Sequence, residues 1–162
     1  MFDLWRFDAG RLTNKGESDM GYYVRLEDST AVLPKKYQAE AYRRMCALND
    51  HDERKRGGSF GPDGEKKWFS WMDPNYPETC ADAKAILVEL GFWFNDKSED
   101  LVFEEYDSKS GQEDLFIFTI ADLMTGYMEW SGEDGAKWRW EFGPDGMKQL
   151  FPKPVEWVEV KG

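Results

Sequence analysis

The stretch GGSFGPDGEKKWFSWMDPNYPETCADAKAILVELGFWF, residues 57–94, carries the strongest local signals in the chain and indicates its fold class. Pro62, Asp63 and Gly64 are typical of a turn, because proline presets φ at the first position and glycine permits a positive φ at the end. The aromatic run that follows, residues 67–72, predicts a strand with at least one buried face. The two sides of this turn are therefore expected to form a β-hairpin.

A helix and a further strand are predicted within the same stretch. Thr79 is a candidate N-cap with Asp82 three residues later, and apolar side chains then fall at helical spacing: Ala83, Ile86, Leu87 and Leu90. Gly91 follows, and glycine commonly closes a helix at its carboxyl end. Residues 92–94 start the next strand directly, so the stretch predicts the order hairpin, helix, strand.

The same order is expected on either side of this stretch. Two short strands precede a predicted helix over residues 35–48, and a second hairpin precedes a helix that Ser110 and Glu113 can open as a capping box. The predicted strands of these hairpins are residues 22–27 and 31–33, and residues 92–94 and 101–103.

The carboxyl-terminal part predicts a meander. Asp-Gly turns separate its first three predicted strands, and Pro152 and Pro154 precede a fourth that would lie at a sheet edge. These strands are residues 127–131, 136–142, 147–151 and 155–160. The whole chain thus predicts an α+β fold in the order ββα-ββα-ββα-ββββ, with an antiparallel sheet built from successive hairpins and about three helices on one side.

Length and composition indicate the class of protein. The 162 residues suit about one domain, and we expect residues 20–162 to form it, with residues 1–19 as an amino-terminal arm or extension. We expect no signal peptide, because the first residues lack its basic and apolar regions, and no apolar run approaches the length of a membrane span. Cys46 and Cys80 suit buried thiols in a reducing compartment. We therefore expect a soluble, cytoplasmic protein.

Charge is unevenly distributed along the chain. A net charge of −11 argues against direct nucleic-acid binding, because phosphates require clustered Lys and Arg. Residues 35–56 nevertheless contain seven Lys and Arg against four Asp and Glu. This basic face is either a solvated surface or a contact for a protein partner or a second copy of the chain, with Arg43 and Arg44 expected to be solvated in the monomer. Its residues are Lys36, Arg43, Arg44, Arg54, Lys55 and Arg56.

The acidic excess gives a second candidate surface. Dense carboxylates either keep the chain hydrated or imitate the phosphates of a nucleic acid and thereby occupy a basic partner. The candidate residues are Glu99, Asp100, Glu104, Glu105, Asp107, Glu113 and Asp114.

Tryptophan gives a third candidate. Trp138 and Trp140 alternate along one predicted strand with Arg139 on the opposite face, whereas Trp68 and Trp71 fall on opposite faces of theirs. These rings either build the core or form a stacking surface for a nucleotide or a sugar.

The sequence contains no catalytic signature. His51 is the only histidine, which excludes a His-based triad and a multi-histidine metal site. Its acidic neighbours, Asp50, Asp52 and Glu53, are consecutive, and consecutive residues rarely converge on one ion. No Cys-x-x-Cys motif or glycine-rich phosphate loop is present. We therefore expect no enzyme activity, no cofactor and no metal, although an enzyme that uses a facing pair of carboxylates stays an open alternative.

Four segments resemble small acidic proteins of unassigned function from actinobacterial phages and mobile elements. They are MGYYVRLED (residues 20–28), WFSWM (68–72), GQEDLF (111–116) and EWSGEDG (129–135). The resemblance brings no catalytic motif. It implies a setting in which compact acidic proteins occupy a partner's surface, for example as counter-defence inhibitors. The leading hypothesis is thus a non-enzymatic inhibitor or adaptor, and the alternative is a protein that binds or sequesters a nucleotide or sugar on a Trp-rich surface.

Overall fold

The computed structural model describes residues 21–62 and 64–161, and its largest sheet is antiparallel. Five strands in these ranges form it in the order β10-β9-β8-β1-β7. Strand β1 (Tyr23–Ser29) lies inside the sheet, between β8 (Gly126–Gly132) and β7 (Asp107–Lys109). Strands β9 (Lys137–Gly143) and β10 (Gly146–Leu150) continue the sheet beyond β8, so β10 and β7 are its two edges.

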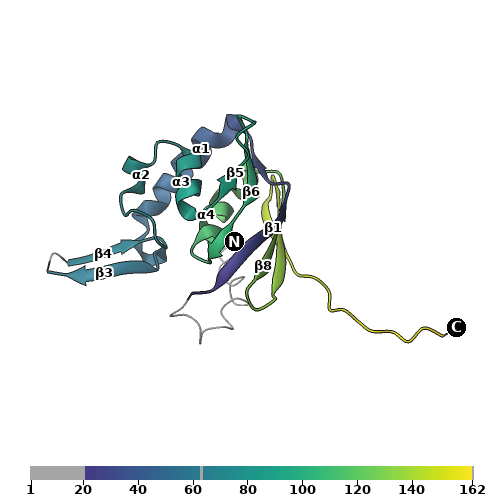
Figure 1. Ribbon diagram of the computed structural model, residues 1–162. Helices are drawn as coiled ribbons and strands as arrows, with labels where there is room; N and C mark the ends of the chain where they lie inside the picture. The colour runs from purple at the N-terminus through teal and green to yellow at the C-terminus, as the bar shows by residue number, and fades with distance from the viewer. Residues whose placement is uncertain (1–20, 63, 162) are drawn as a thin grey trace.

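Two smaller sheets accompany this one in the described ranges. Strands β2 (Val32–Leu33), β6 (Leu101–Glu105) and β5 (Trp93–Phe94) form a three-stranded sheet in that order. Strands β3 (Gly57–Gly61) and β4 (Gly64–Trp68) pair only with each other among the described strands. The β3–β4 hairpin projects from the body, at the left of Figure 1.

The helices gather on one side of the five-stranded sheet (Figure 1). The described chain contains four α-helices: α1 (Gln38–Ala47), α2 (Tyr76–Thr79), α3 (Ala83–Leu90) and α4 (Glu113–Ile120). Short 3-10 turns adjoin them: η2 (Lys35–Tyr37), η3 (Leu48–Asp50), η4 (Asp52–Arg54) and η5 (Ala121–Leu123). None of these helices is long and apolar enough to cross a membrane.

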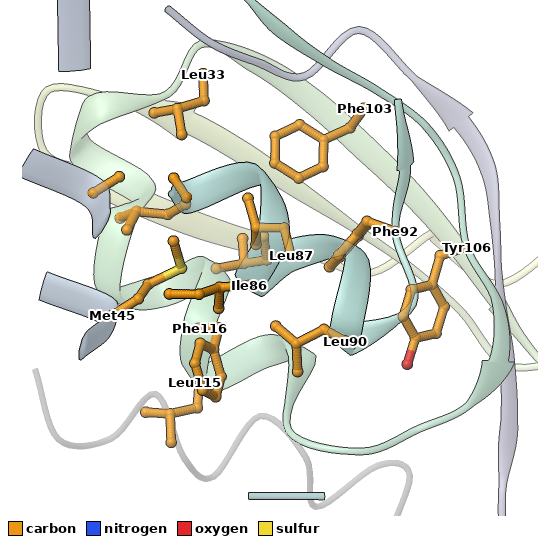
Figure 2. Packing of buried hydrophobic residues seen from close by; sticks show 14 of the residues in the cluster. Leu33, Met45, Ile86, Leu87, Leu90, Phe92, Phe103, Tyr106, Leu115 and Phe116 are labelled. Carbon is orange, nitrogen blue, oxygen red and sulfur yellow. The ribbon is translucent and has the colours of Figure 1, made fainter. Parts of the chain in front are cut away.

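The core fills the space between the helices and the sheet. Helix α3 contributes Ile86, Leu87 and Leu90, which pack beside α1 and α4, and the aromatic residues Phe92 and Tyr106 extend the core toward the strands (Figure 2). The sheet contributes alternate side chains, as expected when one face is buried. These are Val24, Leu26, Met128, Trp130, Trp138 and Trp140.

The structure confirms the α+β class, the hairpin across residues 62–64, the helix that Gly91 ends and the hairpin that pairs Phe94 with Phe103. The predicted capping box does not form, because α4 begins at Glu113 with Gln112 as its N-cap, and the Glu113 side chain instead accepts hydrogen bonds from Ser110 Oγ (3.0 Å) and from the Gly111 main-chain nitrogen (2.7 Å). The predicted arm of residues 1–19 lies outside the described residues.

Several local predictions are wrong. Strand β2 pairs with β6 instead of returning on β1, so residues 22–33 do not form a hairpin. Thr79 ends α2, and the N-cap of α3 is Asp82, whose side chain accepts a hydrogen bond from the Ala85 main-chain nitrogen (2.8 Å). The strand predicted at residues 67–72 ends at Trp68, because Ser70 adopts a φ of 48° and turns the chain. Residues 155–160 are exposed and pair with no described strand.

Candidate binding surfaces

Gln112 fixes the base of the β3–β4 hairpin to the amino end of α4. Its buried side-chain oxygen accepts hydrogen bonds from the main-chain nitrogens of Arg56 (3.1 Å) and Ser70 (3.3 Å). Its amide nitrogen donates to the Arg54 carbonyl oxygen (2.6 Å), and its main-chain nitrogen donates to Ser70 Oγ (2.6 Å). Because Arg56 precedes the hairpin and Ser70 follows it, one side chain holds both ends.

Two glycines permit close approaches at this base. A Cβ atom on Gly111 would lie 2.3 Å from Ser70 Oγ, and one on Gly57 would lie 2.5 Å from the Trp68 ring. Both distances are far below van der Waals contact. A larger residue at Gly111 would therefore push the end of the hairpin away from α4, and one at Gly57 would push apart the two strands of the hairpin itself.

The tip of the hairpin carries an exposed aromatic ring. Phe60 is 86% exposed and lies opposite Glu65 in the ladder. An isolated two-stranded hairpin is marginally stable in water, and this one is held on the body by the hydrogen bonds of Gln112 and by Phe69, which follows β4 and packs against Phe116 of α4.

A pocket of about 490 Å³ opens beside the hairpin base. Lys55 lies in it with a side chain only 5% exposed, and its ammonium group hydrogen-bonds Asp52 (2.7 Å), which lowers the pKa of that carboxyl. The volume falls in the range of small-molecule sites. The structure thus brings three predicted basic residues together with Asp114, which the sequence placed on another surface. The lining residues are Glu53, Arg54, Lys55, Arg56, Gln112, Asp114 and Leu115.

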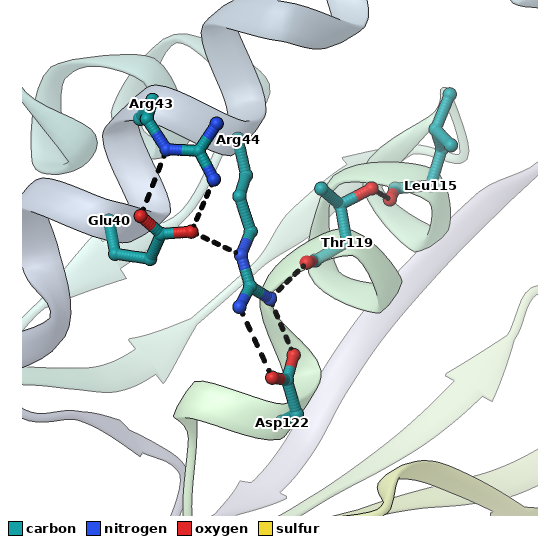
Figure 3. Close-up of polar contacts among 6 residues, drawn as sticks. All are labelled: Glu40, Arg43, Arg44, Leu115, Thr119 and Asp122. Atoms are coloured by element: carbon teal, nitrogen blue, oxygen red, sulfur yellow. Dashed lines mark hydrogen bonds and ion pairs between the residues drawn. The ribbon is translucent and has the colours of Figure 1, made fainter.

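Arg43 and Arg44 are neighbours in α1 but have different environments (Figure 3). The Arg43 side chain is 69% exposed and pairs with Glu40 (2.6 Å). Arg44 reaches the end of α4 and η5, where it donates to Asp122 (2.6 Å) and to the Thr119 carbonyl oxygen (3.2 Å), while its Nε donates to Glu40 (2.9 Å). Hydrogen bonds from Arg43 and Arg44 lower the pKa of Glu40 to about 2.

The expectation that this basic helix face is solvated is therefore wrong for Arg44, which joins two helical segments. It stays a prediction that Lys36 and Arg43, both exposed, contact a partner. The remaining members of the predicted basic face, Arg54, Lys55 and Arg56, lie at the hairpin base and not on α1.

The predicted acidic surface separates into buried and exposed parts. Glu113 and Asp114 are buried at the start of α4, where Asp114 accepts a hydrogen bond from the Leu115 main-chain nitrogen (2.8 Å). Their assignment to an exposed surface is wrong, because the free main-chain donors of a helix amino end attract carboxylates inward. The other five surround β6 and β7: Glu99, Asp100, Glu104, Glu105 and Asp107.

Trp138 and Trp140 are buried in the core, although Trp138 also lines a pocket of about 360 Å³ with Arg139. Trp138 stacks on Trp130 with ring centroids 6.5 Å apart, and Trp140 Nε1 donates to Gln149 (2.8 Å). Arg139 alternates with them along β9 and pairs with Glu129 (2.8 Å) on the other face. The alternation of tryptophan with charged residues, which suggested a stacking surface, therefore reflects a strand with one face in the core and one in solvent.

Trp68 is half-buried and Trp71 is exposed, and both lie near the hairpin base. Trp71 Nε1 donates to the Glu89 carbonyl oxygen (3.0 Å), which ties this ring to α3. The four tryptophans therefore do not meet on one surface.

A metal site requires several titratable side chains grouped around one ion. In the described ranges, no three His, Cys, Asp or Glu side chains gather as ligands for an ion. His51 lies in an exposed turn, 3.2 Å from Glu53. Burial and a hydrogen bond to Glu89 raise the pKa of the Cys80 thiol to about 11, so this cysteine is a poor nucleophile at neutral pH.

The sequence did not reveal Gln112 or Phe60 as candidate residues. A buried glutamine whose partners are main-chain atoms 42 to 58 residues away leaves no periodic pattern. For Phe60 a signal existed, since an aromatic residue beside a Pro-Asp-Gly turn must lie near a hairpin tip.

Comparisons of this chain with known protein families, curated proteins and solved structures found no match. Its function is therefore inferred from its own residues.

Proposed function

We propose that this chain is a non-enzymatic binding protein that occupies the surface of a partner protein through the β3–β4 hairpin. The observation that supports this most directly is Phe60, an 86% exposed ring at the tip of a hairpin that projects from the body (Figure 1). Aromatic side chains are prominent among the residues that dominate interface energies, and exposed apolar groups at projecting positions are frequent contact points.

The hairpin is held in place before any partner arrives. Gln112 bonds the chain on both sides of it, and Lys67 pairs with Glu65 (3.3 Å) along β4. A preformed contact element loses less conformational entropy on binding than a mobile one. This arrangement suits a protein that inhibits or recruits by surface contact alone.

The hairpin region is also the positive part of a negative protein. Residues 51–68 contain five Lys and Arg against four Asp and Glu, whereas the whole chain has a net charge of −11. An acidic partner surface would be attracted to this region and repelled elsewhere, which orients the encounter. We favour this contact over nucleic-acid mimicry, because Glu113 and Asp114 are buried. The setting that we propose, from the resemblance of the four segments above, is a phage or mobile-element inhibitor in the host cytoplasm.

The test compares two exposed aromatic residues on different parts of the surface. Phe60→Ala removes the exposed ring near the hairpin tip, and Trp93→Ala removes a 68% exposed ring from β5 as the matched control. Both variants should keep the melting temperature of the parent chain. In quantitative affinity capture from the natural host, we expect a partner that the parent chain and Trp93→Ala retain and Phe60→Ala loses by tenfold or more, since an anchor residue contributes about 1–2 kcal/mol or more. Equal capture by all three proteins would refute the hairpin as the contact surface.

The pocket beside the hairpin supports a second candidate, the binding of a small anionic ligand such as a nucleotide or a sugar phosphate. Arg54, Lys55 and Arg56 outnumber the carboxylates of Glu53 and Asp114 in the lining of this pocket of about 490 Å³, which replaces the Trp-rich surface as the candidate location. A ligand at a hundredfold excess over its Kd adds about 2.7 kcal/mol of stability, which a thermal-shift panel detects. Loss of that shift in Arg54→Ala, with Phe60→Ala unaffected, would favour this candidate over the hairpin contact.

A further inference from the structure

The carboxyl-terminal segment, residues 151–161, leaves the end of β10 as an extended tail (Figure 1). Its large apolar side chains have exposed fractions between 60% and 95%, and they are Phe151, Val155, Trp157, Val158 and Val160. Valine and tryptophan favour strands, so the composition is that of a β-strand, yet no described strand pairs with it. Contiguous exposed apolar groups of this kind mark an interaction site.

The edge of the five-stranded sheet offers matching hydrogen-bonding groups. The Gly132 main-chain nitrogen donates to the Ala136 carbonyl oxygen (2.8 Å), and hydrogen-bonded pairs recur at every second residue of an antiparallel ladder. Even-numbered residues of β9 therefore bond to β8 and odd-numbered ones to β10. From the register that pairs Glu141 with Lys148, the even-numbered residues of β10 bond back to β9. Met147 and Gln149 consequently direct their main-chain groups to the open edge.

The two prolines of the tail fit the same parity. If the strand direction continues beyond Leu150, main-chain groups of odd-numbered residues face the open side and those of even-numbered residues face away. Proline has no main-chain N–H donor. Because Pro152 and Pro154 are even-numbered, their main-chain groups face away from the open side, and pairing there loses no hydrogen bond. A proline at an odd position would interrupt such a ladder.

We propose that β10 and the tail together form one long strand that pairs antiparallel with the same strand of a second copy, so that each tail covers the partner's β10 edge. Such an exchange is self-complementary about a two-fold axis, the commonest symmetry of protein dimers. It also gives hydrogen-bond partners to the main-chain groups of the open β10 edge, which could otherwise pair with strands of other chains and lead to aggregation. The reach suffices, because eleven extended residues span about 36 Å and the five residues of β10 about 17 Å.

Side-chain chemistry selects one register of this ribbon. With Pro152 on the two-fold axis, Lys148 lies opposite Glu156 and Met147 lies opposite Trp157. The first pair joins opposite charges, and the second places a thioether against an indole on the face where Met147 already packs on the core. Both prolines then occupy pairs that exchange no hydrogen bonds.

The tail cannot cover the edge of its own β10 in the same way. It would have to reverse within residues 151–154, where the sequence Phe-Pro-Lys-Pro offers no glycine or asparagine for a tight hairpin turn and both prolines hold φ near −65°. The other sheet edge, β7, has only three residues, two of them charged. A second copy of β10 is thus the edge that fits the tail.

Sedimentation equilibrium of the full chain and of two proline variants tests the proposal. Val155→Pro removes a main-chain donor that faces the partner, whereas Val158→Pro makes the same chemical change at a position that faces away. We expect the full chain to dimerise in the micromolar range, Val158→Pro to do so with little change, and Val155→Pro to raise the dissociation constant tenfold or more, because symmetry doubles the loss. A chain that ends at Leu150 should be monomeric and keep its melting temperature.

A cross-link tests the register. In a Cys46→Ser background, Lys148→Cys with Glu156→Cys should give a disulfide-linked dimer, since directly opposed Cβ atoms lie about 4.5–5.5 Å apart. Lys148→Cys with Glu159→Cys is the matched control, because residue 159 points to the other face. The proposal would be overturned if the full chain were monomeric, or if neither Val155→Pro nor Val158→Pro changed the dissociation constant of the dimer. Equal cross-linking by the two cysteine pairs would overturn it as well, as would a tail that binds other proteins while the chain stays monomeric.

Discussion

Replacing Arg44 with methionine should destabilise the protein, whereas the same change at Arg43 should not. Methionine keeps an apolar stem and removes the guanidinium group. At Arg44 this loses the hydrogen bonds to Asp122, to the Thr119 carbonyl oxygen and to Glu40, from a side chain that is only 28% exposed. At Arg43 it loses only an exposed pair with Glu40.

The expected size follows from these contacts. Partly exposed ion pairs contribute about 0.2–1 kcal/mol each and a hydrogen bond to a main-chain carbonyl about 1 kcal/mol, so Arg44→Met should lower the free energy of unfolding by about 1–2 kcal/mol. For a chain of this length that corresponds to a melting temperature about 2–8 °C lower. Calorimetry and urea unfolding of both variants at pH 7 measure the difference. Equal shifts for the two variants, or a larger one for Arg43→Met, would show that the link between α1 and η5 is not stabilising.

Two further predictions concern the hairpin base and the acid range. Gly111→Ala should destabilise the chain and increase protease cleavage of the β3–β4 hairpin, because the new Cβ would lie 2.3 Å from Ser70 Oγ. The control is Gly143→Ala, which should be close to neutral because no atom lies within 4 Å of its Cβ position. The pKa of Glu40 falls from 4.5 unfolded to about 2 folded, so its contribution is present above pH 4.5 and is lost as pH falls toward 2. Glu40→Gln should therefore unfold with a weaker dependence on pH between 5 and 2 than the parent chain, and identical acid profiles would contradict this assignment.

The sequence predicts those parts of the fold that local chemistry decides. The Pro-Asp-Gly turn defines the β3–β4 hairpin, and the apolar spacing that ends at Gly91 defines α3, since both signals lie within about ten residues of one another. Strand pairing at long range is a different matter. Nothing near residues 31–33 indicates that they pair with residues 101–102, because that choice depends on the whole packed core.

The candidate site was predictable only in part, for the same reason. The density of Arg54, Lys55 and Arg56 marks the loop from sequence alone, but its relation to Gln112 arises from tertiary hydrogen bonds. Glu113 and Asp114 look like surface residues in any count of charges. Their burial follows from their place at a helix amino end that is packed against the hairpin base, which composition does not encode.

The position of β1 inside the sheet has a consequence for synthesis of the chain. Val24 pairs with Ser108 on one side and with Gly132 on the other, so its neighbours are translated 84 and 108 residues later. At about 5–20 residues per second, β1 waits roughly 5–20 s for its second neighbour, with Val24 and Leu26 unburied meanwhile. Pairing over such separations is also slow in itself. A nascent chain shorter than about 107 residues holds a central strand that has neither neighbour, and this is the interval in which a chaperone would have most to bind.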